Sequence, residues 1–171
     1  MPVYLARHSR VAVSGLCYGQ SEVPLAGSFA EEAAALKAQL AARFACAPKV
    51  LCSPSARCVT LADALGVDYQ TDARLMELHF GAWEGRLWTE IDGPEARHWG
   101  EHWQVAAPPG GETLGQLMAR VDACATEHAS GGDLLLITHA GPIRALWHQR
   151  GGLTLEQAFA RSVPHATLIA L

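Results

Sequence analysis

The chain has 171 residues and a mass of 18.3 kDa, which suffices for one compact domain with a hydrophobic core. Hydrophobic residues make up 50% of it and charged residues 18%, a balance that excludes a disordered or fibrous protein. The net charge of −4 at pH 7 excludes a generally basic surface, so we expect no nucleic-acid partner and no membrane partner. Any site for an anion must therefore be local.

The cysteines and the N-terminal segment indicate the cellular compartment in which we expect the protein. The five cysteines are odd in number and include no C-x-x-C pair, which fits neither a disulfide framework nor a zinc module. Arg7 and His8 interrupt the first apolar segment before it reaches the length of a signal peptide. We therefore expect a cytoplasmic protein without a membrane span.

Apolar spacing in the first half of the chain predicts two helices between three short strands. The expected elements are a strand at 3–5, a helix at 28–44, a strand at 49–52, a helix at 53–65 and a strand at 67–70. Ser28 is the expected N-cap of the first helix, with Glu31 in the capping-box position. Ser53 and Pro54 are the expected N-cap and first residue of the second helix, which Gly66 ends.

The second half of the chain predicts a long excursion followed by two more helices and two strands. The expected elements are an irregular excursion at about 81–110, a helix at 112–129, a strand at 133–138, a helix from 141 and a final strand at 166–171. The excursion holds four of the five tryptophans, and we expect it to act as a lid. The alternation predicts an α/β fold in a single domain over 1–171, a three-layer αβα sandwich with a mostly parallel central sheet.

Polar residues follow three of the expected strands at the point where each strand ends. These segments are Arg7-His8, Ser53 to Arg57, and Thr138-His139. Ligands of open α/β sheets bind beyond the carboxyl ends of the strands. Arginine binds phosphate oxygens through its forked guanidinium, neutral histidine can attack phosphorus, and a helix N-terminus adds N–H donors. The sequence therefore predicts a site for a phosphoryl group.

Each of these segments also has an ordinary structural interpretation. A lone histidine after a strand is usually a hydrogen-bonded loop residue, and a lone arginine in the first turn of a helix is usually a surface charge. Three such segments at equivalent strand ends favour the functional interpretation.

Four segments together resemble the histidine phosphatase superfamily, which has the phosphoglycerate-mutase-like fold. They are Arg7-His8-Ser9, the S-P-S-A-R-C-V-T segment at 53–60, the L-M-E-L-H-F-G-A-W-E-G segment at 75–85, and Thr138-His139-Ala140-Gly141. Within the superfamily, the segments at 15–21, 80–85 and 109–112 are most similar to those of the alpha-ribazole phosphatases of cobalamin biosynthesis.

This resemblance implies an enzyme that acts through a phosphohistidine. His8 would be the nucleophile, and Arg7, Arg57 and His139 would hold the phosphoryl oxygens. Glu77 would be the proton donor, which agrees with the chemistry, because an alkoxide leaving group needs an acid near the scissile oxygen. The resemblance implies no metal and no other cofactor.

The segment after His8 departs from the family pattern R-H-G-E-T-x-x-N. The chain reads R-H-S-R-V-A-V-S at 7–14. Ser14 takes the place of the asparagine and is expected to donate a hydrogen bond to phosphate with a shorter reach. Ser9 in place of glycine requires a backbone that avoids positive φ. Val11 removes a hydroxyl from the anion site, and Arg10 adds a positive charge.

Other polar and aromatic residues are expected to have structural roles. Glu84 is expected to hold the F-G-A-W-E-G turn, and Phe80 and Trp83 to pack rather than to contact substrate. His98 and His102 have the spacing of a helical zinc pair, but no glutamate follows His98 and no third ligand is nearby in the sequence. We expect them to be an exposed pair on the lid.

The predicted function is a phosphomonoesterase for a small phosphorylated metabolite, with alpha-ribazole 5′-phosphate or adenosylcobalamin 5′-phosphate as the leading substrates. A phosphoglycerate mutase or another small-substrate phosphatase of the superfamily is an alternative, although such mutases carry longer insertions around the acid residue. The altered segment at 9–14 motivates an alternative of another class, a non-catalytic sensor or scaffold for a phosphate ester. The sequence leaves a homodimer open.

Overall fold

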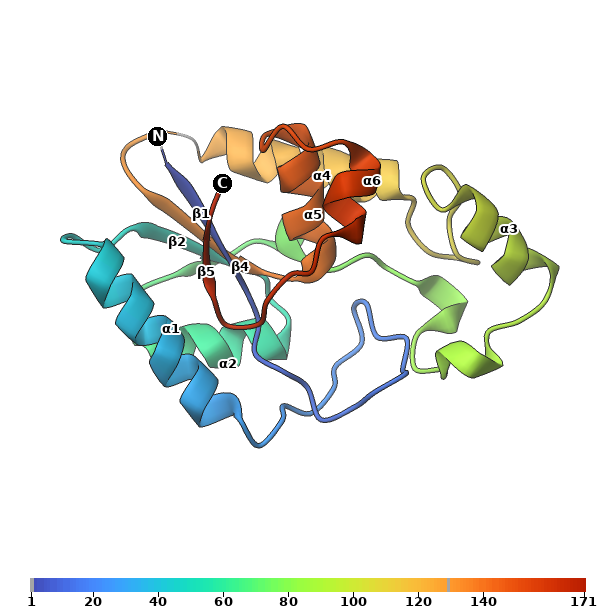
Figure 1. The fold of residues 1–171 in the computed structure, drawn as a ribbon, viewed down its shortest axis with the longest axis horizontal. Coiled ribbons are helices and arrows are strands. Elements are labelled where there is room, and N and C mark those ends of the chain that lie inside the picture. The colour runs from blue at the N-terminus through green and yellow to red at the C-terminus, as the bar shows by residue number, and fades with distance from the viewer. Residues whose placement is uncertain (1, 129) are drawn as a thin grey trace.

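The computed structural model describes residues 2–128 and 130–171. Its centre is a five-stranded sheet with the strand order β3-β2-β4-β1-β5 (Figure 1). The strands are β1 Val3–Arg7, β2 Lys49–Cys52, β3 Gln70–Thr71, β4 Leu134–Thr138 and β5 Leu168–Ala170. The first four run parallel to their neighbours, and β5 is antiparallel to β1. The predicted α/β fold with a mostly parallel sheet is confirmed.

Helices cover both faces of the sheet, and Figure 1 shows one group on each side. One face carries α1 Phe29–Arg43 and α2 Ala56–Leu65. The other carries α4 Leu114–Glu127, α5 Ala140–Gln149 and α6 Leu155–Ala160. The short α6 was not predicted; a capping box between Thr154 and Gln157 starts it.

The apolar run at 134–137 forms the centre of the core, because every residue of β4 is buried. Leu134 and Leu136 pack against the helices of one face, and Leu135 and Ile137 against those of the other. This alternation is the expected behaviour of a central strand covered on both sides. The residues that follow the strand are therefore held rigidly at its carboxyl end.

Two helix starts and one strand differ from the predictions. Helix α2 begins at Ala56 with Ser55 as N-cap, because the hydroxyl of Ser53 is engaged with His139. Ser28 does precede α1, but its side chain bonds Glu32 instead of forming a capping box with Glu31. The strand expected at 67–70 lies at Gln70–Thr71.

The excursion at 81–110 contains no strand and has three short helical segments, all described by the structure. They are η2 Gly81–Trp83, η3 Trp88–Glu90 and α3 Pro94–His102, and a further turn, η1 Ala73–Leu75, precedes them. Figure 1 shows α3 standing apart from the sheet. Trp99 joins the segments through ring contacts with Trp83 at 5.5 Å and Trp88 at 6.3 Å. Across the described ranges, the model has no helix with the length and apolar character of a bilayer span.

Candidate active site

The sheet topology brings the strand-end residues together. Strands β1 and β4 are neighbours, and Arg7 pairs in register with Thr138, so His8 and His139 follow adjacent strand ends. Their ring centroids are 5.2 Å apart. Four of the predicted residues line one cavity of about 120 Å³. The lining residues are Arg7, His8, Leu16, Tyr18, Gly19, Arg57, Glu77, Phe80 and Trp88. We call it the phosphoryl cavity.

His8 is buried and has one ring nitrogen available. Its Nδ1 lies 2.7 Å from the carbonyl oxygen of Ser9, so Nδ1 carries the proton and donates. The lone pair is therefore on Nε2. Burial, aided by the positive charges of Arg57 and Arg7, holds the pKa of His8 well below its usual value. A neutral imidazole with a free Nε2 has the form that a nucleophile requires.

His139 lies behind Arg57 rather than in the lining of the phosphoryl cavity. Nη2 of Arg57 donates to Nδ1 of His139 at 3.1 Å, so the ring proton is on Nε2, which lies 2.8 Å from the hydroxyl of Ser53. Burial and the neighbouring His8 and Arg57 lower the pKa of His139 well below its usual value. Both ring nitrogens are thus bonded to protein groups, and the predicted contact with phosphate stays a prediction.

The two arginines bring positive charge into a chain whose net charge is negative. Arg57 is buried and donates to the carbonyl oxygens of Gly19 at 2.7 Å and Ser21 at 3.1 Å. Arg7 donates from Nη1 to the carbonyl oxygen of Val163 at 3.0 Å. Within the described ranges, the buried Nε atoms of both arginines have no hydrogen-bond partner. The positive charge of these two guanidinium groups, which line the cavity, favours an anion there.

Glu77 is fixed by backbone donors on both carboxylate oxygens. The N–H of Leu78 donates to Oε1 at 2.9 Å, and the N–H of Gly141, at the start of α5, donates to Oε2 at 3.1 Å. The carbonyl oxygen of Glu77 accepts from Gln20 at 3.1 Å and from Arg120 at 3.0 Å. Both the position and the orientation of this carboxylate are therefore set by the fold.

The altered segment after His8 turns away from the phosphoryl cavity. Ser14 is exposed and is not among the lining residues, so its predicted contact with phosphate stays a prediction. Ser9 is buried and, as expected, has no positive φ. Arg10 pairs at 2.8 Å with Glu32 on α1, so the charge it adds is directed to the protein surface.

In the F-G-A-W-E-G turn, two of the three residues have the roles expected from the sequence. Glu84 accepts hydrogen bonds from the backbone N–H groups of Gln20, Ser21 and Phe80, which confirms its role in holding the turn. Trp83 is buried, as expected. Phe80 lines the phosphoryl cavity as well as packing, so the expectation of packing alone was incomplete.

His165 was missed by the sequence analysis. Its ring lies 5.4 Å from that of His8, and its Nδ1 donates to the carbonyl oxygen of His8 at 2.9 Å. The N–H of Ala166 donates to the carbonyl oxygen of Arg7 at 3.0 Å, and Ala166 has a positive φ of 41°. No local sequence pattern predicts this contact, because the contact depends on the path of the chain into antiparallel β5.

Two groups of metal-ligating side chains lie outside the phosphoryl cavity. His98 and His102 are exposed on α3 with stacked rings 4.6 Å apart, which confirms the predicted exposed pair. Asp72, Cys124 and His128 hold ligand atoms within 4.8 Å of one another. Hydrogen bonds from Arg74 lower the pKa of Asp72 to about 2, so a guanidinium already neutralises this carboxylate.

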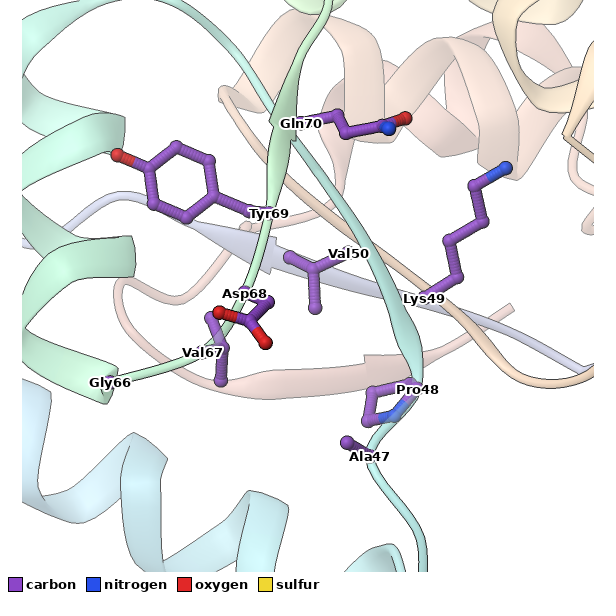
Figure 2. A pocket seen from close by; sticks show the side chains of 9 residues that line it. All are labelled: Ala47, Pro48, Lys49, Val50, Gly66, Val67, Asp68, Tyr69 and Gln70. Atoms are coloured by element: carbon purple, nitrogen blue, oxygen red, sulfur yellow. The ribbon is translucent and has the colours of Figure 1, made fainter.

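A larger cavity of about 650 Å³ lies at the amino ends of β2 and β3 (Figure 2). His8 follows the carboxyl end of β1, so this cavity is at the opposite end of the sheet. It is lined by residues 47–50 and 66–70, with Lys49 and Asp68 as its charged members. None of the predicted site residues lies there. Size therefore does not identify the site; the convergence of histidine, arginine and glutamate does.

The model of the histidine phosphatase superfamily, branch 1, matches residues 3–171. The chain belongs to this superfamily. The alpha-ribazole phosphatase from Shigella flexneri is similar in structure, with a TM-score of 0.87 at 26% identity, covering 99% of this chain and 89% of that one. A phosphoglycerate mutase from Thermus thermophilus has a TM-score of 0.77 at 28% identity, covering 100% and 92%.

A curated relative of this chain is longer. A bifunctional protein of Mycobacterium tuberculosis is 35% identical over 95 residues, which cover 52% of this chain and 26% of the relative. The match thus spans about a quarter of that relative's length.

Proposed function

We propose that this histidine phosphatase is a phosphoric monoester hydrolase that acts through phosphorylated His8. The observation that carries the proposal is the neutral His8 ring, with Nε2 free, in a cavity shared with Arg7, Arg57 and Glu77. The guanidinium groups of Arg7 and Arg57, which line the cavity, give it an affinity for phosphoryl oxygens.

In the first step, Nε2 of His8 attacks phosphorus while the bond from phosphorus to the ester oxygen breaks. The Glu77 side chain donates a proton to that oxygen, so the alcohol leaves neutral. Arg7 and Arg57 stabilise the charge that develops on the phosphoryl oxygens. His139 holds Nη2 of Arg57 in place, because its Nδ1 accepts from that atom.

In the second step, the Glu77 carboxylate takes a proton from water as the water oxygen attacks the phosphohistidine. The P–N bond breaks, inorganic phosphate leaves, and His8 returns to its neutral form. A general acid and base of this kind contributes roughly 10²–10⁴ in rate.

For the substrate, we propose alpha-ribazole 5′-phosphate or adenosylcobalamin 5′-phosphate. Two features support this choice: the similarity to the Shigella flexneri alpha-ribazole phosphatase, and the glycine-rich contact between Gly81 and the 109–111 segment, where the sequence elements typical of those enzymes meet. The similarity to the Thermus thermophilus mutase supports phosphoglycerate mutase as a second candidate.

The experiment is a measurement of phosphate release from alpha-ribazole 5′-phosphate, adenosylcobalamin 5′-phosphate and 3-phosphoglycerate. We expect release from a cobalamin precursor, loss of turnover by at least about 10³ in His8→Ala, and an acid-labile phosphoryl label on His8. His98→Ala is the matched control, because His98 is exposed on α3. Isomerisation of phosphoglycerate without phosphate release would favour the mutase. Binding of these esters without turnover would favour a sensor.

A further inference from the structure

Arg120 on α4 is engaged through all five N–H groups of its guanidinium. Nε donates to Oε1 of Glu112 at 2.6 Å and Nη2 donates to Oε2 at 2.8 Å, so this ion pair is bidentate. Nη1 donates to the carbonyl oxygens of Arg74 and Met76, both at 2.7 Å. Nη2 also donates to the carbonyl oxygen of Glu77 at 3.0 Å. We call Arg120 and Glu112 together the clamp.

The clamp holds the stretch of backbone that carries the Glu77 side chain. Glu77 lies between η1 and η2, outside any helix or strand. Besides the three carbonyls that Arg120 holds, the hydroxyl of Thr138 donates to the carbonyl oxygen of Leu75 at 2.6 Å. Four consecutive carbonyls are thus fixed by side chains from α4 and β4. These bonds, rather than a regular element, determine the path of the chain at Glu77.

Glu112 extends the clamp to the residues after Glu77. Its Oε2 accepts from the N–H of His79 at 3.3 Å, and its own N–H donates to the carbonyl oxygen of His79 at 2.9 Å. Glu112 ends the P-G-G-E segment, and Thr113 follows it as the N-cap of α4. The start of α4 therefore sets the position of Glu112 and places Arg120 roughly two turns further along the same helix.

We propose that the clamp is a positioning unit for the proton donor, and that it keeps the Glu77 carboxylate at the ester oxygen by holding the chain on both sides. The inference rests on the proposed function, because it takes Glu77 as the acid. Arg120 bonds the carbonyl oxygen of Glu77 rather than its carboxylate. Neither member of the clamp lines the phosphoryl cavity. The clamp therefore acts on the reaction only through the position of Glu77.

The chemistry of proton transfer explains why such a clamp matters. An acid must lie within hydrogen-bond reach of the oxygen that it protonates, and a misplacement of about 1 Å can cost roughly 10² in rate. A guanidinium presents five donors in a planar fork, whereas the ammonium of lysine presents three from one atom. Arginine at position 120 can therefore hold a carboxylate and three carbonyls at once, and lysine cannot.

The test compares single-turnover rates of His8 phosphorylation by ethyl phosphate and by 4-nitrophenyl phosphate. The first leaving group depends on the proton of Glu77, and the second needs little protonation. Arg120→Met keeps an apolar stem but removes all five donors, so the rate with ethyl phosphate should fall about tenfold to a hundredfold. The rate with 4-nitrophenyl phosphate should fall much less. An equal loss for both esters in a folded Arg120→Met would overturn the proposal, because a merely structural role slows both.

Arg150→Met is the matched control. Arg150 also binds α4 through a carboxylate, donating to Asp122 at 2.9 Å and to the hydroxyl of Thr126 at 2.6 Å. Its loss should lower the Tm without changing the ratio of the two rates. A change of ratio as large as that of Arg120→Met would show that loosening α4 is sufficient, and would overturn the clamp.

Two milder variants test the geometry of the clamp. Arg120→Lys keeps the charge and should still lose most of the rate with ethyl phosphate; a wild-type ratio in this variant would contradict the need for the fork. Glu112→Gln should change the ratio in the same direction by a smaller factor, because the amide oxygen still accepts one hydrogen bond. This variant also carries the comparison if Arg120→Met does not fold, and an unchanged ratio in it would overturn the proposal.

Glu77→Gln separates this inference from the proposed function. If Glu77→Gln slows ethyl phosphate selectively and Arg120→Met does not, the clamp alone is overturned. If Glu77→Gln slows both esters equally, or if neither ester phosphorylates His8 in the wild-type protein, the proposed function is overturned and the clamp with it.

Discussion

A side chain at position 141 would overlap the carboxylate of Glu77. The N–H of Gly141 donates to Oε2 of Glu77 at 3.1 Å, and a Cβ atom built on Gly141 would collide with Oε1 of the same residue. The glycine of the T-H-A-G segment therefore allows Glu77 to approach the start of α5. The T-H-A-G segment thus positions Glu77, the proposed acid, in addition to supplying His139 behind the phosphoryl cavity.

Gly141→Ala should push Glu77 out of its position and lower kcat for an alkyl phosphate by about tenfold to a hundredfold, a part of what a general acid contributes. Gly27→Ala is the control, because a Cβ at Gly27 meets no atom within 4 Å. Steady-state kinetics of the two variants on one alkyl ester provide the measurement. Equal activity of both variants would show that the position of Glu77 does not matter.

Glu77→Gln should separate substrates by the acidity of their leaving group. The variant keeps the cavity but has no proton to give, so the burst of an alkyl ester should fall by roughly 10²–10⁴. The burst of a nitrophenyl ester, whose leaving group needs little protonation, should fall much less. The burst is decisive, because the same carboxylate is proposed to activate water in the second step. An equal loss for both esters would remove Glu77 as the acid.

His165→Ala should reduce kcat by about tenfold with little change in KM, because the hydrogen bond to the carbonyl oxygen of His8 is lost while the arginines remain. His165→Asn should recover most of the rate, since an amide N–H can donate to the same oxygen. Single-turnover rates of His8 phosphorylation provide the readout. If the asparagine variant is as slow as the alanine variant, the donated hydrogen bond is not the cause.

The depressed pKa values of His8 and His139 predict a dependence of stability on pH. Both groups are neutral in the folded protein well below the ordinary value of 6.5, whereas the unfolded chain takes up protons near that value. The unfolded state then binds more protons, so the free energy of unfolding should fall as the pH drops below about 6.5. Urea titrations at several pH values from 7.5 downward measure this. A stability that rises on acidification over this range would contradict the neutral pair.

The neutral pair also predicts that activity persists into mildly acidic solution. Since Nε2 of His8 keeps its lone pair, the acidic limb of kcat/KM should not have its midpoint near 6.5 but below it.

The strand-end motifs were predictable from the sequence because an apolar run and the polar residues directly after it can be recognised within a short segment. An apolar run followed by Arg7-His8, and another by Thr138-His139, must deliver those residues to one edge if the strands are parallel neighbours, as β1 and β4 are. The resemblance to the histidine phosphatases added Glu77, which no strand end marks.

The remaining contacts depend on geometry that sequence patterns do not encode. His165 reaches His8 only because β5 is antiparallel and Ala166 adopts a positive φ. Arg10 could not be assigned to Glu32 without knowing where α1 lies. The six residues of α6 give too short an apolar repeat to indicate a helix.

The hydrogen bonds at the end of β1 join an early and a late segment of the chain, which the ribosome synthesises at different times. Arg7 and Val163 are 156 positions apart, and His8 and His165 are 157 apart. Contacts of this range form late, because the entropy of closing so long a loop must be overcome first. During synthesis, His8 therefore leaves the ribosome long before His165, which bonds its carbonyl oxygen in the folded protein. The hydrogen bonds that join Arg7 to Val163 and His8 to His165 form only after the segment before β5 has left the ribosome.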